Sequence, residues 1–193
     1  MTSDQEIIES LAKVISGFQV HTITRLDKIE FGEDIRDEAE AFLQDGGSLD
    51  EAIERFGGDL LETSIEEHNV FLNEGINDIF NKIVGTVGTA FNNANAECGV
   101  GNSTTSESAT QTGLIGGSQL YKAQDGSYPL GAGSGQNVDF RSTFGSSEAN
   151  FAWEEFCTRN GVAPGIDLHR TVSAQGTKIS GQTWVLTITL SAT

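Results

Sequence analysis

Lysine and arginine are scarce in this chain of 193 residues. There are 11 of them against 28 aspartates and glutamates, which gives a formal net charge of −17. A surface of that charge repels the phosphate backbone of nucleic acids and the headgroups of anionic lipids. Apolar residues also never form a run near the roughly 18 that a membrane-spanning helix needs. We therefore expect no nucleic-acid partner and no membrane partner.

Cysteine is scarcer still, with only Cys98 and Cys157. Two cysteines at this separation provide neither a disulfide framework nor the spacing of a zinc site. Both lie in segments with the alternating pattern of strands, so we expect two buried thiols and no bound metal or cofactor. The first residues, MTSDQEIIES, are acidic where a secretory signal would be basic and then apolar. This pattern predicts a protein made in the cytoplasm.

Helical patterns dominate the first 64 residues. Ser3 and Glu6 form a capping box, in which each side chain satisfies a free backbone N–H. Further amphipathic segments run from about 33 to 46 and from 48 to 57. We expect residues 1–64 to form a helical anchoring or assembly region. Its candidate docking residues are Ile7, Leu11, Ile15, Ile53 and Phe56.

Packing inside the domain would explain the same apolar faces, so both interpretations stay open. If the region is a separate anchor, deleting the residues before about Thr63 should leave a soluble β domain that no longer joins its partner.

After Thr63 the pattern changes from helical to alternating. The segment EGINDIFNKIVG predicts one more amphipathic helix, and Gly, Ser, Thr and Asn dominate from Thr86 onward. The stretch FRSTFGSSEANFAWEEF, residues 140–156, predicts two aromatic strands joined by a small-residue turn. We expect an α+β fold in which residues 65–193 form a helix and an antiparallel β-sandwich of jelly-roll or immunoglobulin-like type. The candidate core residues of the sandwich are Phe140, Phe144, Phe151, Trp153, Trp184, Leu186 and Ile188.

The residue types that enzymes use for catalysis do not gather in the sequence. His169 stands two residues after Asp167, so the two would share one face of a strand as a base and its orienting carboxylate, but no serine lies in a nucleophile-elbow context. Glu154 and Glu155 are adjacent and would point to opposite faces of a regular strand. The segment GVGNSTTSES lacks the lysine of a phosphate-binding loop and predicts a loop after the Cys98 strand. We expect no catalytic activity; the alternative is a hydrolase that depends on His169 and Glu154.

Five segments follow one another in an order that resembles a known protein group. They are HNVFLNEGINDIFNKIVG, AFNNANAECGVGNSTTSESATQTGL, YKAQDGSYP, VDFRSTFGSSEANFAWEEF and GTKISGQTWVLTITLS, and they span about residues 68–193. They resemble a group of small virion structural proteins of tailed bacteriophages and related archaeal tailed viruses. The chain departs from the group where HRTVSAQGTK replaces an NRKV segment before LGTK, and where the loop NGVAPGID is short. The helical first third lies outside the resemblance.

The resemblance implies a virion component that is made in the host cytoplasm. We expect it on the outside of the particle as a head decoration, turret or fibre-base protein. Its expected partners are other virion proteins, capsid or tail subunits, in a symmetric homo-oligomer. The alternative is a tail or baseplate adhesion module that binds a host-surface glycan or protein. Its ligand platforms would be Tyr121, Tyr128, Trp153 and Trp184.

Overall fold

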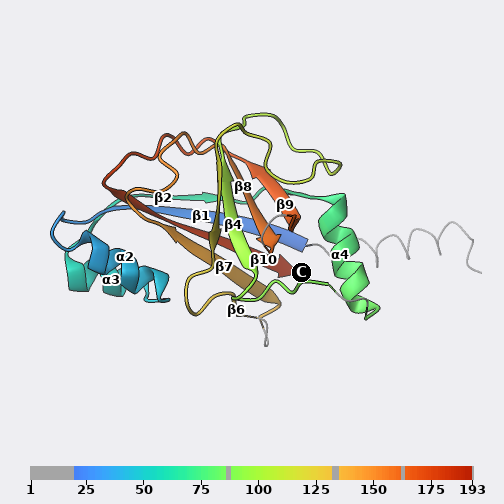
Figure 1. Cartoon of the computed structure of the whole chain (residues 1–193), viewed down its shortest axis with the longest axis horizontal. Coiled ribbons are helices and arrows are strands. Elements are labelled where there is room, and N and C mark those ends of the chain that lie inside the picture. Colours follow the sequence, from blue (N-terminus) through green and yellow to red (C-terminus); the bar gives the residue numbers. More distant parts are fainter. Residues whose placement is uncertain (1–19, 86–87, 132–134, 162–163, 193) are drawn as a thin grey trace, which may run out of the picture.

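Two five-stranded antiparallel sheets pack face to face in the computed structural model, which describes residues 20–85, 88–131, 135–161 and 164–192 (Figure 1). The α+β sandwich predicted from the sequence is confirmed. Sheet A has the order β2 (Asp59–Glu66), β1 (Val20–Glu30), β10 (Gln182–Ala192), β7 (Asn137–Phe144) and β6 (Leu130–Gly131). Sheet B has the order β3 (Val70–Phe71), β9 (Ile166–Val172), β8 (Glu155–Asn160), β4 (Ala96–Gly101) and β5 (Gln119–Ala123).

Aromatic side chains fill the space between the sheets. The ring of Trp153 lies 4.8 Å from the ring of Phe144 and 4.8 Å from that of Trp184, edge to face in both pairs. The indole N–H of Trp153 donates to the carbonyl of Ala149 at 2.9 Å, so the only polar atom of this buried ring is satisfied. Six of the candidate core residues are buried, and Phe151 packs against them while partly exposed. The six are Phe140, Phe144, Trp153, Trp184, Leu186 and Ile188.

The two aromatic strands of residues 140–156 do not form the hairpin that the sequence predicts. β7 ends at Phe144 in sheet A, whereas β8 begins at Glu155 in sheet B. Trp153 lies in the connecting segment, where its backbone N–H donates to the Gly176 carbonyl at 2.8 Å. Alternation identifies the residues that face the core. The core lies between two sheets, however, and the alternation does not say to which sheet a strand belongs.

The boundary expected at residue 64 is wrong, because β1 and β2 belong to the sandwich. β1 pairs with β10 along its whole length, from Val20 opposite Ala192 to Glu30 opposite Gln182. β2 pairs with the other side of β1. The strand pattern of β1 is concealed because buried positions of β1 carry polar residues: Thr22, Thr24 and Lys28 are all at most 8% exposed. Residues 1–19, with the docking candidates Ile7, Leu11 and Ile15, lie outside the described part of the chain.

The other predicted helices are present as α2 (Arg36–Gln44) and α3 (Leu49–Phe56), which cover part of the outer face of sheet A (Figure 1). Ser48 caps α3 by accepting the Glu51 N–H at 3.2 Å, and Gly57 ends the helix with a left-handed φ of 69°. Both helices pack on a second, smaller core. Its buried members are Ile29, Phe31, Ala39, Leu43, Ala52 and Val185.

Helix α4 (Asn73–Ile83), also predicted, lies against β9 of sheet B. Gly75 makes this contact possible, because a Cβ atom there would lie 2.5 Å from the Leu168 carbonyl oxygen. No helix in the described ranges is long and apolar enough to cross a membrane.

The position of β1 inside sheet A makes a truncation informative. A chain shortened to residues 64–193 loses β1 and exposes one whole side of β10, so we expect no cooperative unfolding transition. A chain shortened to residues 20–193 keeps both sheets and should unfold cooperatively. Thermal unfolding followed by circular dichroism checks both. A cooperative transition for residues 64–193 would show that the sandwich does not need β1.

Candidate functional site

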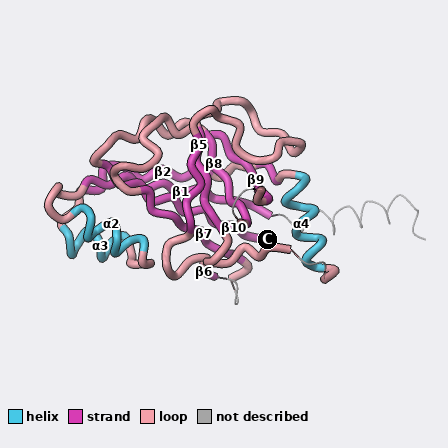
Figure 2. The backbone as a smooth tube through the Cα atoms, in the orientation of Figure 1, coloured by secondary structure: helices cyan, strands magenta, loops and turns pink. Residues whose placement is uncertain are grey.

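The outer face of sheet B carries a layer of buried polar side chains. The long loop between β4 and β5, residues 102–118, covers this layer (Figure 2). At its centre the carboxylate of Glu155 on β8 accepts a hydrogen bond from Nε of Arg170 on β9 at 2.7 Å, and both side chains are 0% exposed. An ion pair so completely removed from water is stable only if its remaining donors and acceptors are also satisfied.

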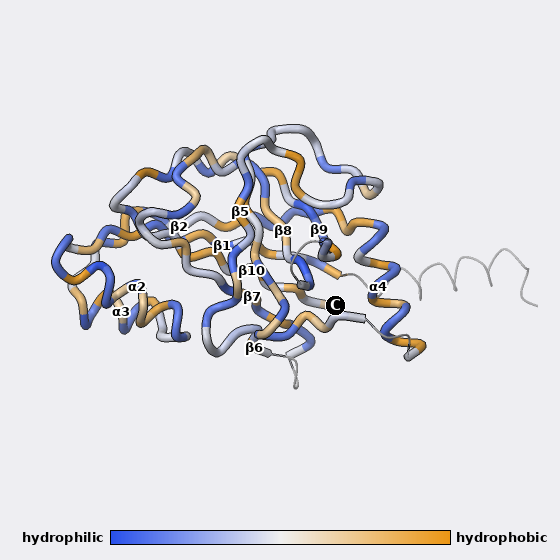
Figure 3. The backbone as a smooth tube through the Cα atoms, viewed as in Figure 1, coloured by the Kyte–Doolittle hydropathy of each residue, from blue (hydrophilic) through white to orange (hydrophobic). Residues whose placement is uncertain are grey.

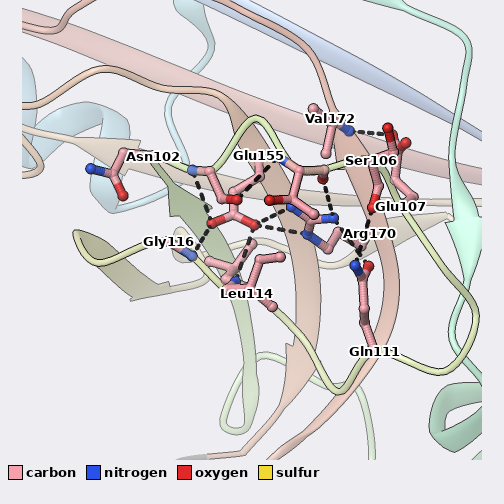
Figure 4. Close-up of polar contacts among 12 residues, drawn as sticks. Asn102, Ser106, Glu107, Gln111, Leu114, Gly116, Glu155, Arg170 and Val172 are labelled. Carbon is pink, nitrogen blue, oxygen red and sulfur yellow. Dashed lines mark hydrogen bonds and ion pairs between the residues drawn. The ribbon is translucent and has the colours of Figure 1, made fainter.

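The loop supplies most of those partners (Figure 4). Nη2 of Arg170 lies 2.7 Å from Oε2 of Glu155 but makes no hydrogen bond of its own. The backbone N–H of Gly116 donates to Oε1 of Glu155 at 2.7 Å, and that of Ile115 donates to Oε2 at 3.1 Å. On the other side, Nη1 of Arg170 donates to the Thr105 carbonyl at 2.9 Å and to Oε1 of Gln111 at 3.1 Å. The carboxylate is therefore occupied by donors from its own chain, which is the arrangement of a structural charge and not of a general acid or base.

Two glycines of β4 create the room for this layer. A side chain at Gly101 would overlap the carboxylate of Glu155, and a Cβ at Gly99 would lie 2.6 Å from the Cys157 sulfur. The GVG segment, expected to be a loop, is thus the end of a strand that must have no side chains on its outer face. The sequence analysis did not identify the role of Arg170. The only sign of the polar layer in the sequence is this pair of glycines within a strand pattern.

A second polar group lies beside the ion pair and contains Tyr121, Cys157 and Asp167. Burial raises the pKa of Asp167 to about 6, against the opposing effects of the Cys157 thiol and the Arg159 guanidinium. Burial also holds the pKa of Cys157 well above its usual value. A thiol that stays protonated is a poor nucleophile and a poor metal ligand. The expectation that Cys98 and Cys157 are buried thiols is confirmed.

His169 and Asp167 do not form the base-and-orienter pair considered from the sequence. The register shifts between Thr158 and Arg159, so Asp167 lies opposite Arg159 while His169 lies opposite Thr158. The irregularity places the two side chains on opposite faces of β9. His169 is 0% exposed, and burial lowers its pKa to about 4, so the ring is neutral near pH 7.

The carboxylates of the hydrolase alternative are also separated. Glu155 is fully buried in its ion pair, whereas the side chain of Glu154 is partly exposed. In the described part of the chain, no group of three or more His, Cys, Asp or Glu side chains could hold a metal ion.

The described docking candidates are largely accounted for by packing. Phe56 packs against the second core, with its ring 5.7 Å from that of Phe42, and Ile53 is half-buried. The more exposed apolar side chains lie on segments that the sequence did not single out for docking. They are Leu60, Leu61 and Ile65 on β2, Phe80, Ile83 and Val84 at the end of α4, and Ile179 between β9 and β10.

The aromatic platforms of the adhesion alternative are mostly turned inward. Trp153 and Trp184 are at most 2% exposed. The ring of Tyr121 is covered by the Arg159 guanidinium at 3.5 Å, and that of Tyr128 by Arg141 at 4.4 Å.

Comparison with protein-family models, with curated proteins and with solved structures finds no match to the chain. Its function must therefore be argued from its own residues and surfaces.

Replacing one partner of the buried pair should be costly. Arg170→Met leaves the Glu155 charge buried without its cation, and we expect a loss of about 3–5 kcal/mol in the free energy of unfolding. The matched control is Lys122→Met, because Lys122 and its partner Glu148 are 22% and 32% exposed and Glu148 keeps the hydrogen bond from the Gly145 N–H at 2.9 Å. It should lose about 1 kcal/mol or less. Urea unfolding measures both; equal losses would contradict a structural role for the pair.

Asp167 should make stability depend on pH. Its carboxyl has a pKa of about 6 in the folded chain against 3.8 ordinarily, so between about pH 4 and 6 the folded state binds more protons than the unfolded state. The contribution of Asp167 to stability is therefore present at low pH and is lost as the pH rises through 6. Asp167→Asn does not titrate, so at pH 7.5 it should be more stable than the native chain by about 2–3 kcal/mol.

This advantage of Asp167→Asn should disappear near pH 4, as measured by urea unfolding at both pH values. The control Asp34→Asn changes an exposed carboxylate and should show the same difference from the native chain at both. A constant advantage of Asp167→Asn across the range would contradict the prediction.

Proposed function

We propose that the chain is a virion structural protein on the outside of a tailed-virus particle, as a head decoration, turret or fibre-base component without catalytic activity of its own. The proposal starts from the ordered segments between residues 68 and 193 that resemble this protein group. The buried state of Glu155 and His169 supports it, because the residues that a hydrolase would need are enclosed or engaged inside the fold.

The observation that carries the proposal is the edge strand β2. It forms the edge of sheet A, and three of its eight residues are large apolar side chains that stay exposed: Leu60 and Leu61 at 48% and Ile65 at 57%. An edge strand that is long and apolar tends to pair with another chain unless it is protected. β2 contains neither lysine nor proline, and its three carboxylates are the only charged side chains along this edge. It is suited to permanent contact with a neighbouring subunit.

The net charge of −17 fits the same role. A chain needed in many copies must stay soluble until it assembles, and strong like charge opposes association of free copies. Partners in the particle would be other virion proteins, and nucleic acid and membrane are disfavoured by the same charge.

The location on purified particles tests the proposal. Gold-labelled antibody against the chain should mark the particle shell in electron micrographs. Label on the tail alone would instead favour the adhesion module, and absence of label from intact particles would overturn the structural role.

An edge-strand variant tests the proposed contact. Ile65→Lys puts a charge on the exposed edge and should lower incorporation into particles at least about tenfold, measured by quantitative mass spectrometry of purified particles. The control is Leu130→Lys on β6, the opposite and much shorter edge of the same sheet, where the side chain is 43% exposed. Equal incorporation of both variants would exclude β2 as the contact.

A further inference from the structure

Lys178 is a buried lysine that has no carboxylate partner. It lies in the connection between β9 and β10 and is 0% exposed. The buried side chains of Arg141 and Arg170 each bind a carboxylate, at 2.8 and 2.7 Å. Among the described residues no carboxylate forms an ion pair with Lys178. Burial therefore lowers the pKa of its amine to about 8, against the opposing charges of Glu40 and Glu148.

Two oxygen atoms of the connection between β7 and β8 accept hydrogen bonds from this lysine. Its Nζ donates to the Gly145 carbonyl at 2.7 Å and to Oδ1 of the Asn150 carboxamide at 3.1 Å. Because a C=O bond is about 1.23 Å long, Cγ of Asn150 lies within about 4.3 Å of Nζ. Atoms poised to react are about 3–3.5 Å apart, so a shift of at most about 1 Å brings Nζ to the carbon atom.

Backbone pairing between the two connections keeps these side chains together. The Lys178 N–H donates to the Phe151 carbonyl at 3.1 Å, and the adjacent Thr177 forms an antiparallel bridge with Ala152. In Figure 3 the two connections run over the upper left of the sandwich, with hydrophobic and hydrophilic residues mixed along them. The fold has thus already ordered the amine and the Asn150 carboxamide as neighbours, which removes most of the entropy cost of a reaction between them.

The hydrogen bonds of Asn150 orient its carboxamide for such a reaction. Nδ2 donates to the Ser146 carbonyl at 3.1 Å, so the carbonyl side of the group faces Lys178. Asn150 is exposed, so a nitrogen released from its side chain passes directly into water. A lysine amine becomes a nucleophile when burial favours its neutral form, and Lys178 meets that condition.

We propose that Lys178 and Asn150 form an intramolecular isopeptide bond in the folded chain. The lone pair of the neutral amine forms the bond from Nζ to Cγ, and the bond from Cγ to Nδ2 breaks. Nζ gives up one proton, Nδ2 gains one, and the nitrogen leaves as ammonia, so no oxidant or cofactor takes part. Glu40 and Glu148, whose charges act on Nζ, are the acids and bases in place to carry that proton.

The product is one covalent tie between the β7–β8 connection and the β9–β10 connection. Both connections pass from one sheet to the other, so the bond fastens the two sheets together at this end of the sandwich. It is a single modification of the chain by itself, without turnover. It is a property of the free protein and goes beyond the proposed role in a particle.

The mass of the intact full-length chain tests the bond. After incubation at pH 9, where the Lys178 amine is mostly neutral, the native chain should be lighter than its sequence by about 17 Da, the mass of ammonia. Proteolysis should then give one peptide in which Asn150 and Lys178 are joined. Asn150→Ala lacks the carboxamide and Lys178→Arg carries a guanidinium that stays protonated, so both should keep their full mass. Asn150→Ala changes an exposed side chain and should fold as the native chain does.

The matched control is Asn81→Ala, which removes another exposed asparagine and should show the same loss of mass as the native chain. Two results would overturn the proposal. A native chain of full mass after the incubation would show that the amine and the carboxamide do not react. A loss that persists in Asn150→Ala would come from another asparagine, such as Asn160 before Gly161, which can cyclise onto its own backbone. The measurement does not involve particles, so its failure leaves the proposed virion role untouched.

Discussion

The carboxylate of Glu155 sets the conditions that sheet B and its covering loop must meet. A charge removed from water destabilises the fold unless cations and hydrogen-bond donors surround it. Arg170 supplies the cation from the next strand, residues 115–116 supply backbone N–H groups, and Gly101 leaves the space that the carboxylate occupies. Strand, loop and glycine are thus tied to one ion pair. The loop that the sequence predicted after the Cys98 strand is held in place by the group it covers.

Buried cations elsewhere in the fold also need hydrogen-bond partners, and two of the chain's few lysines are enclosed in this way. Lys28 lies 4.8 Å from the ring of Trp184, and its ammonium donates to Glu62 at 2.6 Å and to the Gln175 carbonyl at 2.7 Å. Burial lowers the pKa of Lys178 to about 8, and its ammonium donates to the Gly145 carbonyl at 2.7 Å. Lys28 holds the segment that contains Gln175 against β1, and Lys178 joins the two connecting segments 173–181 and 145–154 to each other. The loops are therefore held by polar contacts where the aromatic core does not reach.

Sequence patterns predicted those parts of the fold in which polarity and burial agree. The alternation of Trp184, Leu186 and Ile188 identified β10, and Ser48 with Gly57 marked the ends of α3. β1 was missed because Thr22, Thr24 and Lys28 are buried, so polarity no longer reports burial there. The polar layer around Glu155 was missed because it joins residues from three strands and a loop. Such a group can be recognised only once the topology is known. The only sign of it in the sequence is the pair Gly99 and Gly101 within a strand pattern.

The place of β1 and β2 inside the sandwich changes where contacts with other proteins can arise. The surface of the sandwich itself can then take part in the proposed contacts, and β2 is an exposed edge of it with apolar side chains. The sequence of β2, DLLETSIE, has three carboxylates and no cation. Antiparallel pairing of two copies about its centre would set Asp59 opposite Glu66 at both ends, and like charges facing across strands destabilise a sheet. If β2 makes the proposed contact, the charge pattern favours a partner that presents lysine or arginine over a second copy of this chain.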